Sequence, residues 1–132
     1  MEDVSFSYRA KEEIISKINS KPKADVCMMG MLTYCNCLSD DEISFLTENK
    51  AVADFFVLNT GRITGNENAV LVTEQKKRNG VVLYALDIPE REDRLTLLDY
   101  FRMDKSRRLE EADLPKEKFY PQLVAGIFLA CG

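Results

Sequence analysis

Two segments of this 132-residue chain are apolar almost all round, and they restrict the folds open to it. One covers residues 24–38 and the other residues 123–132, and near the middle of each lies a glycine, Gly30 or Gly126. A helix with no polar face is normally buried on every side. A glycine inside a helix costs about 1 kcal/mol against alanine, which is tolerated where another backbone comes close. The sequence therefore predicts two buried helices with a close approach at each glycine.

The two segments also contain the same residue types in the same order. In each, a cysteine follows five positions after the glycine (Cys35 and Cys131), and a turn-forming residue comes next. This pattern is typical of an internal repeat of roughly one α/β half-domain, with two unrelated buried helices as the alternative. The longest uncharged apolar runs, residues 26–35 and 123–132, are about half the length of a membrane span, so neither predicts a transmembrane helix.

The remaining segments alternate between helical and strand patterns. Helical spacing predicts helices over residues 7–18, 50–60 and 89–101, and β-rich runs predict strands over residues 42–47, 69–74 and 81–88. Asn79-Gly80 favours a hairpin turn, so the last two strands are expected to pair antiparallel. The fold class predicted is α+β.

Two further details concern the helix ends. Asn49 is expected to cap the helix over residues 50–60, and Pro89 is expected to open the helix over residues 89–101 at its first position. Three side chains of that last helix are predicted to face inward: Leu95, Leu98 and Phe101.

Composition excludes several kinds of chemistry. The chain has no histidine, which removes Ser/His and Cys/His nucleophile pairs, histidine bases and histidine-ligated metals. The net charge is -4 and the pI about 5.0, which argues against a chain whose main task is to neutralise phosphates. The acidic start of the chain does not resemble a signal peptide, so we expect a soluble, cytoplasmic protein.

The four cysteines are expected to be buried thiols rather than disulfides. Cys35, Cys37 and Cys131 are also candidates for a zinc site or a redox role. The spacing of Cys35 and Cys37 does not fit the paired C-x₂₋₄-C pattern of structural zinc sites, so inert packing is favoured and no metal is predicted.

Residues 102–120 are rich in charge and poor in apolar side chains, which is typical of a solvated linker, with a short helical turn possible over residues 106–112. This divides the chain into a first unit (residues 1–101), a linker (102–120) and the start of a second unit (121–132). Because the last apolar pattern stops midway, we expect the sequence to be a fragment of a longer protein.

The segment Val124-Ala125-Gly126-Ile127-Phe128-Leu129-Ala130-Cys131-Gly132 resembles the LAGLIDADG motif of homing endonucleases. The whole chain is similar to the N-terminal part of the WhiA family of Gram-positive sporulation and cell-division transcription regulators. The matching features, in order, are Ser5-Phe6-Ser7 with Lys11-Glu12-Glu13, the helix around Gly30, Leu46-Thr47-Glu48-Asn49 before the Val52 helix, the basic hairpin before Val81, and the Gly126 helix.

The resemblance implies a LAGLIDADG half-domain, made of a motif helix, an antiparallel sheet and covering helices, followed by the start of a second motif helix. The two motif helices would pack together through Gly30 and Gly126. A helix–turn–helix domain that binds DNA normally follows and is missing here. The full-length protein would then be bacterial and nucleoid-associated.

The resemblance also bears on catalysis. In active LAGLIDADG nucleases an acid near the end of each motif holds a divalent metal, and the matching positions here are Cys35 and Cys131. Thiols are poor ligands for Mg²⁺, which prefers carboxylate oxygen. We therefore expect no enzyme activity and no cofactor, and a metal-dependent homing endonuclease is the least favoured function.

The basic residues Lys76, Lys77 and Arg78 form the one candidate DNA contact, with a solvated turn as the favoured alternative. The function predicted is a non-catalytic scaffold in a WhiA-like DNA-binding transcription regulator, and the runner-up contacts DNA directly through its sheet and basic hairpin. The expected partners are DNA, through the missing domain, and a second copy, through helix exchange or direct pairing of motif helices.

Overall fold

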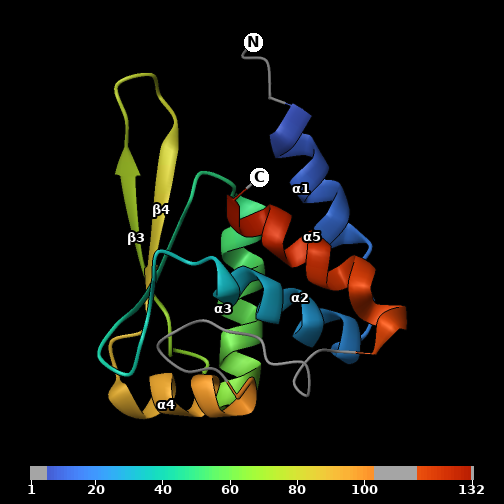
Figure 1. Ribbon diagram of the computed structural model, residues 1–132. Coiled ribbons are helices and arrows are strands. Elements are labelled where there is room, and N and C mark those ends of the chain that lie inside the picture. The colour runs from blue at the N-terminus through green and yellow to red at the C-terminus, as the bar shows by residue number, and fades with distance from the viewer. Residues whose placement is uncertain (1–5, 103–115, 132) are drawn as a thin grey trace.

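The structure is a computed structural model, and it describes residues 6–102 and 116–131. In these residues five helices and a four-stranded antiparallel sheet form an α+β fold (Figure 1), which confirms the predicted class. The helices are α1 (Phe6–Ser16), α2 (Lys21–Thr33), α3 (Lys50–Thr64), α4 (Arg91–Tyr100) and α5 (Tyr120–Cys131), with a 3-10 turn η2 (Glu117–Phe119) before α5. The strands are β1 (Cys37–Leu38), β2 (Ile43–Thr47), β3 (Leu71–Lys76) and β4 (Val82–Asp87).

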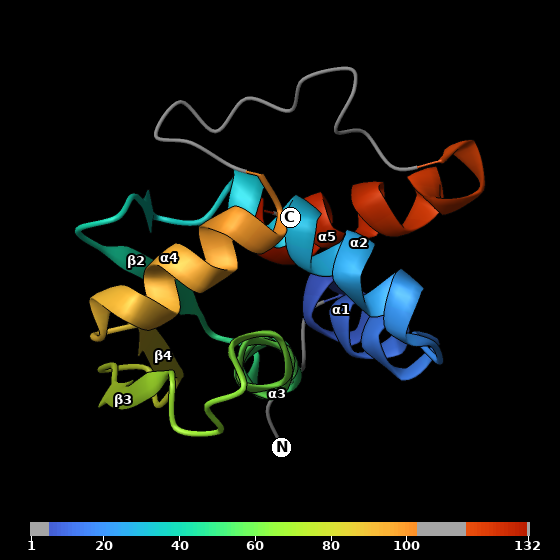
Figure 2. The same ribbon diagram turned by 90° about the horizontal axis from the view of Figure 1, so that it is seen from below.

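Helix α3 is the central element of the fold. The sheet lies on one side of it, and α1, α2 and α5 lie on the other (Figures 1 and 2). The core fills the space between these layers, where the rings of Phe45 on β2 and Phe56 on α3 stack with their centroids 5.3 Å apart. Helix α1 has no fully buried residue, and it packs against this core through Ile14 and Ile15.

The sheet has the strand order β1-β2-β4-β3, so β3 is an edge strand. The predicted antiparallel pairing of β3 with β4 is confirmed, with Val72 opposite Leu86. The turn between them spans residues 77–80, where the Gly80 amide donates to the carbonyl of Lys77 (3.0 Å). Gly80 takes a left-handed conformation (φ 85°), which suits a glycine that closes a hairpin.

The caps of α3 follow from its sequence. The Asn49 side chain accepts a hydrogen bond from the Val52 amide (3.2 Å), which confirms the predicted N-cap. The helix continues to Thr64, beyond the predicted end near residue 60. It ends at Gly65, whose left-handed conformation (φ 76°) directs its amide to the carbonyl of Gly61.

The predicted boundaries of the first apolar helix are wrong. Helix α2 begins at Lys21 because the side chain of Ser20 caps it, and it ends at Thr33. The apolar run then continues into strand β1, where Cys37 pairs with Ser44. A continuous apolar run occurs both in buried helices and in buried strands, so periodicity alone did not separate the helix from the strand.

The predicted start of the last helix of the first unit is also wrong. Helix α4 begins at Arg91, because the amide of Ile88 still bonds to β2 through the carbonyl of Ile43 (3.1 Å). Leu95 is 39% exposed rather than inward, and Leu97 takes its place in the core. Leu98 and Phe101 are buried as predicted.

The predicted linker is described only in part. Its proposed helical turn over residues 106–112 lies outside the described residues. At its end, the 3-10 turn η2 begins at Glu117 and α5 begins at Tyr120, four residues and one residue before the predicted boundary at 121. None of the helices described is long and apolar enough to cross a membrane.

Candidate functional site

Helices α2 and α5 lie side by side and run in the same general direction (Figures 1 and 2). A Cβ atom added to Gly30 would lie 2.5 Å from the carbonyl oxygen of Leu123 and 2.9 Å from the amide nitrogen of Ile127. A Cβ atom added to Gly126 would overlap the carbonyl oxygen of Cys27. Each glycine therefore faces the carbonyl of the residue three positions before the other glycine.

This reciprocal arrangement is the relation expected of two equivalent helices about a local two-fold axis. Backbone contacts this close are formed only by residues without a side chain, and they favour weak Cα–H···O hydrogen bonds between the helices. The structure thus brings Gly30 and Gly126 together at one crossing point. Both glycines are buried in this interface.

The two cysteines at the matching motif positions differ in their surroundings. Cys35 follows the end of α2 and is buried, and its thiol donates to the carbonyl of Cys37 (3.2 Å). Cys131 ends α5 and is exposed, and its thiol donates to the carbonyl of Ile127 (3.1 Å). In the described residues, no three histidine, cysteine or carboxylate side chains are grouped so that they could hold a metal ion.

These environments predict different thiol reactivities. We expect a maleimide to modify Cys131 first and Cys37 next, because only these two cysteines reach the surface. Burial raises the pKa of Cys27 to about 12, so this thiol and Cys35 should react at least about 100-fold more slowly, on opening of the fold. Intact-mass spectrometry over time measures the order, with Cys131→Ser as the control. Equal labelling of all four thiols would contradict this packing.

The basic residues Lys76, Lys77 and Arg78 lie at the exposed tip of the β3–β4 hairpin, which extends beyond the helices (Figure 1). They do not form one row. Lys77 makes an ion pair with Glu48 (3.2 Å), and both side chains are 47% exposed. Lys76 lies opposite Val82, on the sheet face that carries the buried Leu86. The structure therefore does not align the three cations on the open face of the sheet.

The open face of the sheet has little charge. Alternation along β2 turns Leu46 away from the core, and its side chain is 43% exposed. Cross-strand neighbours share a face, so the register places the following residues with it: Ser44, Leu71, Thr73, Gln75, Leu83, Ala85 and Asp87. The single charged residue in this set, Asp87, is acidic, and the cations beside this face, Lys11 and Lys77, line a hollow together with Leu46 and Leu83.

Sequence reasoning missed a hollow of about 350 Å³ between α1, the end of α5 and the open sheet face. Lys11 lines it, and its ammonium lies over the Phe128 ring, 5.7 Å from the centroid. Burial lowers the pKa of Lys11 below its ordinary value, although Cys131 and Glu48 act in the opposite direction. No sequence signal pointed to it, because its residues come from four separate elements.

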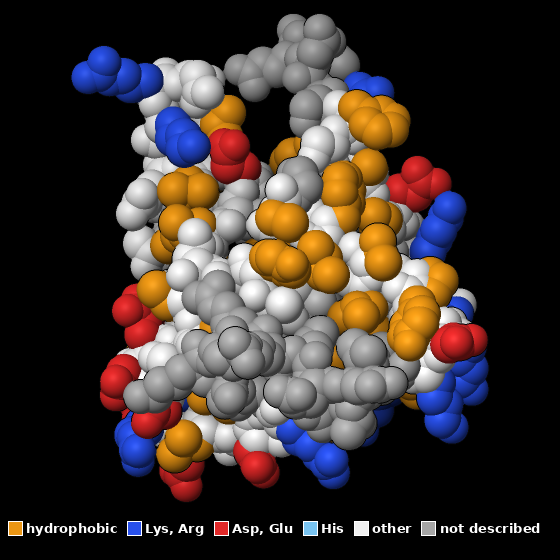
Figure 3. All heavy atoms as spheres, viewed as in Figure 1, with side chains coloured by type: hydrophobic (Ala, Val, Ile, Leu, Met, Phe, Trp, Pro, Cys, Tyr) orange, Lys and Arg blue, Asp and Glu red, His pale blue; other side chains and the backbone are white. Residues whose placement is uncertain are grey.

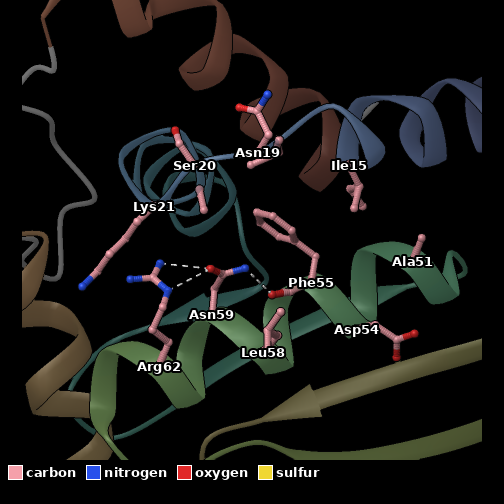
Figure 4. Close-up of a pocket in the computed structure, with 12 residues that line it drawn as sticks. Ile15, Asn19, Ser20, Lys21, Ala51, Asp54, Phe55, Leu58, Asn59 and Arg62 are labelled. Carbon is pink, nitrogen blue, oxygen red and sulfur yellow. Dashed lines mark hydrogen bonds between the residues drawn. The ribbon is translucent and has the colours of Figure 1, made fainter.

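A largely apolar hollow of about 620 Å³ lies between the α1–α2 corner and α3 (Figure 4). Phe55 and Leu58 from α3 and Ile15 from α1 line it, and Arg62 lies at one end. The guanidinium of Arg62 is already bound, because Nη2 donates to Asp25 (2.5 Å) and to the side chain of its neighbour Asn59 (3.0 Å).

Asp25 also ties α2 to α4. Its second carboxylate oxygen accepts a hydrogen bond from the hydroxyl of Tyr100 (2.6 Å). This hydrogen bond raises the pKa of Tyr100 above its ordinary value, and partial burial adds to the effect. Asp25 thus joins Arg62 and Tyr100 across three helices, which is a structural role and not a reactive centre.

No protein-family model, no curated protein and no solved structure matches this chain.

Proposed function

We propose that the chain is a non-catalytic scaffold domain of LAGLIDADG type, from the N-terminal part of a WhiA-like DNA-binding transcription regulator. The observation that carries this proposal is the reciprocal contact of Gly30 and Gly126 between two parallel helices. The resemblance implies such a pair of motif helices. The succession of α2, a four-stranded antiparallel sheet and the helices around it supports the same assignment.

The residues at the metal-acid positions support a role without catalysis. In the family the acids of both motifs converge on a divalent metal, whereas Cys35 here is buried and Cys131 is exposed on the last turn of α5. A hard cation such as Mg²⁺ gains little from thiol ligands. The domain would instead hold a separate DNA-binding domain in position or contact a protein partner.

Direct DNA contact is the second candidate, and the projecting basic hairpin favours it. Against it stands the ion pair of Lys77 with Glu48, and the strand residues on the open face of the sheet include no cation. A single basic tip on an acidic chain supplies few phosphate contacts, so the affinity it can provide is small.

DNA binding and cleavage separate these functions. We expect the chain to bind a labelled duplex no better than ordinary non-specific binding, at roughly 10⁻⁴ to 10⁻⁶ M at physiological salt, in fluorescence anisotropy. It should leave supercoiled plasmid intact with millimolar Mg²⁺ or Mn²⁺. A nanomolar affinity lost when Lys76, Lys77 and Arg78 become alanine would favour the second candidate. Chelator-sensitive nicking that co-purifies with the protein would contradict the non-catalytic assignment.

A further inference from the structure

The tip of the β3–β4 hairpin carries a chemically labile pair of residues. Asn79 is followed by Gly80, whereas every other asparagine of the chain is followed by a residue that has a side chain. The side-chain amide of an asparagine can be attacked by the backbone nitrogen of the next residue, and a Cβ atom on that residue hinders the approach. Glycine has no Cβ atom and lets the two groups come close. Asn79 is therefore the asparagine of this chain most open to loss of its amide group.

The fold leaves this pair in contact with water and away from the core. Residues 71–80 are all exposed, and the end of the hairpin extends beyond the helices (Figure 1). In Figure 3 basic side chains lie at this end of the hairpin, clear of the body of the molecule. Within the described part of the chain, residues 78–80 form no hydrogen bond to a residue outside the hairpin. Opening of the tip therefore breaks few contacts, which is typical of the local openings that cost a fold least.

Three hydrogen bonds hold the tip closed. The Lys77 amide donates to the carbonyl of Val81 (2.8 Å), and the Gly80 amide donates to the carbonyl of Lys77 (3.0 Å). The Val81 amide donates to Oδ1 of Asn79 (3.0 Å). In the closed turn the hydrogen on the Gly80 nitrogen is thus bound to Lys77, and the Asn79 side chain is held by Val81. A reaction between Asn79 and Gly80 requires that these hydrogen bonds open first.

We propose that Asn79 is a site of spontaneous deamidation, and that opening of the hairpin tip sets its rate. The Gly80 nitrogen gives its proton to a base in the solvent and bonds to Cγ of Asn79, which closes a succinimide ring. The Cγ–Nδ2 bond breaks, and Nδ2 takes up a proton and leaves as ammonia. Water then adds to one of the two ring carbonyls and opens the ring, to aspartate or to isoaspartate. Water is the co-reactant, and nothing is oxidised or reduced.

Deamidation changes both the charge and the backbone of the basic tip. Lys76, Lys77 and Arg78 precede Asn79, so one new carboxylate lowers the net charge of residues 76–79 from +3 to +2. In the isoaspartate form the main chain gains a methylene group between the Lys77 carbonyl and the Gly80 amide, so the turn that their hydrogen bond closes no longer has the right length. The proposal rests on the hairpin alone, and not on the proposed function.

Peptide mapping after incubation of the folded chain in mildly alkaline buffer tests the site. Mass spectrometry with separation of aspartate from isoaspartate should find both products at Asn79. Asn68 is the internal control, because it is also exposed but is followed by Ala69, and it should react at least about 10-fold more slowly. An Asn79 that stays unmodified, or equal conversion of Asn79 and Asn68, would overturn the proposal.

A second comparison tests whether the hairpin controls the rate. A synthetic peptide of residues 75–82 has the same sequence around Asn79, but an isolated hairpin of this size does not hold its turn closed. We expect the peptide to deamidate at least about 10-fold faster than the folded chain under the same conditions. Equal rates in the peptide and in the folded chain would show that opening of the tip does not set the rate.

Discussion

Replacement of Gly126 by alanine is expected to destabilise the fold by about 3 kcal/mol or more. The new Cβ would overlap the carbonyl oxygen of Cys27 and lie 2.9 Å from its carbonyl carbon. All the nearest atoms belong to the backbone of α2, so no side-chain rotation relieves the contact, and the helices must separate. The better helix propensity of alanine returns only about 1 kcal/mol.

Urea unfolding followed by circular dichroism measures this effect. Gly61→Ala is the matched control, because Gly61 also lies inside a helix, but its added Cβ would meet its nearest neighbour, the Cα of Glu67, at 3.3 Å. We expect this control to remain within about 1 kcal/mol of the unchanged chain. Equal stabilities of the Gly126 and Gly61 variants would show that α2 and α5 do not meet as described.

Replacement of Arg94 by methionine is expected to destabilise the fold by about 2–4 kcal/mol. Arg94 is 9% exposed, and its guanidinium donates to the carbonyls of Asp40 (2.8 Å), Ile88 (2.9 Å) and Pro89 (2.7 Å). These hydrogen bonds tie the loop before β2 and the chain after β4 to helix α4. Methionine keeps much of the volume but leaves the three carbonyls without their donor.

Arg91→Met is the comparison that isolates this role. Arg91 lies one turn earlier on the same helix, is largely exposed, and approaches Asp40 only at 3.8 Å. Surface pairs of this kind contribute about 0–1 kcal/mol, so its loss should change the free energy of unfolding little. If the two arginine variants unfold at the same denaturant concentration, the hydrogen bonds of Arg94 do not stabilise the fold as inferred.

Much of the fold was predictable because local signals specify it. Asn49 caps a helix, and the turn that ends in Gly80 joins two strands whose alternating pattern sets their pairing. The errors lie where tertiary contacts decide. The apolar run after Thr33 enters a strand because its backbone pairs with β2, and α4 starts late because Ile88 remains bonded to the sheet.

The candidate site was predictable only in the part that repeats in the sequence. The glycines of α2 and α5 were visible because the same small residue recurs in two apolar helices. The hydrogen bonds of Arg94 to Asp40 and of Tyr100 to Asp25 were not, because each joins residues far apart in the chain. Val124, Phe128 and Cys131 were predicted to lie in an apolar helix, but their exposure depends on what covers them, which no local pattern contains.

The reciprocal glycine contact has a consequence for how much sequence the helix pair requires. The crossing point joins backbone to backbone, so its geometry is encoded by two residues and by the absence of their side chains. The other positions of both helices are then free to serve different neighbours. This explains how Met28 can fill a core while Val124, also two residues before its glycine, is exposed. Because the contact depends on two glycines, substitutions elsewhere in the two helices should be tolerated, and substitutions of Gly30 or Gly126 should not.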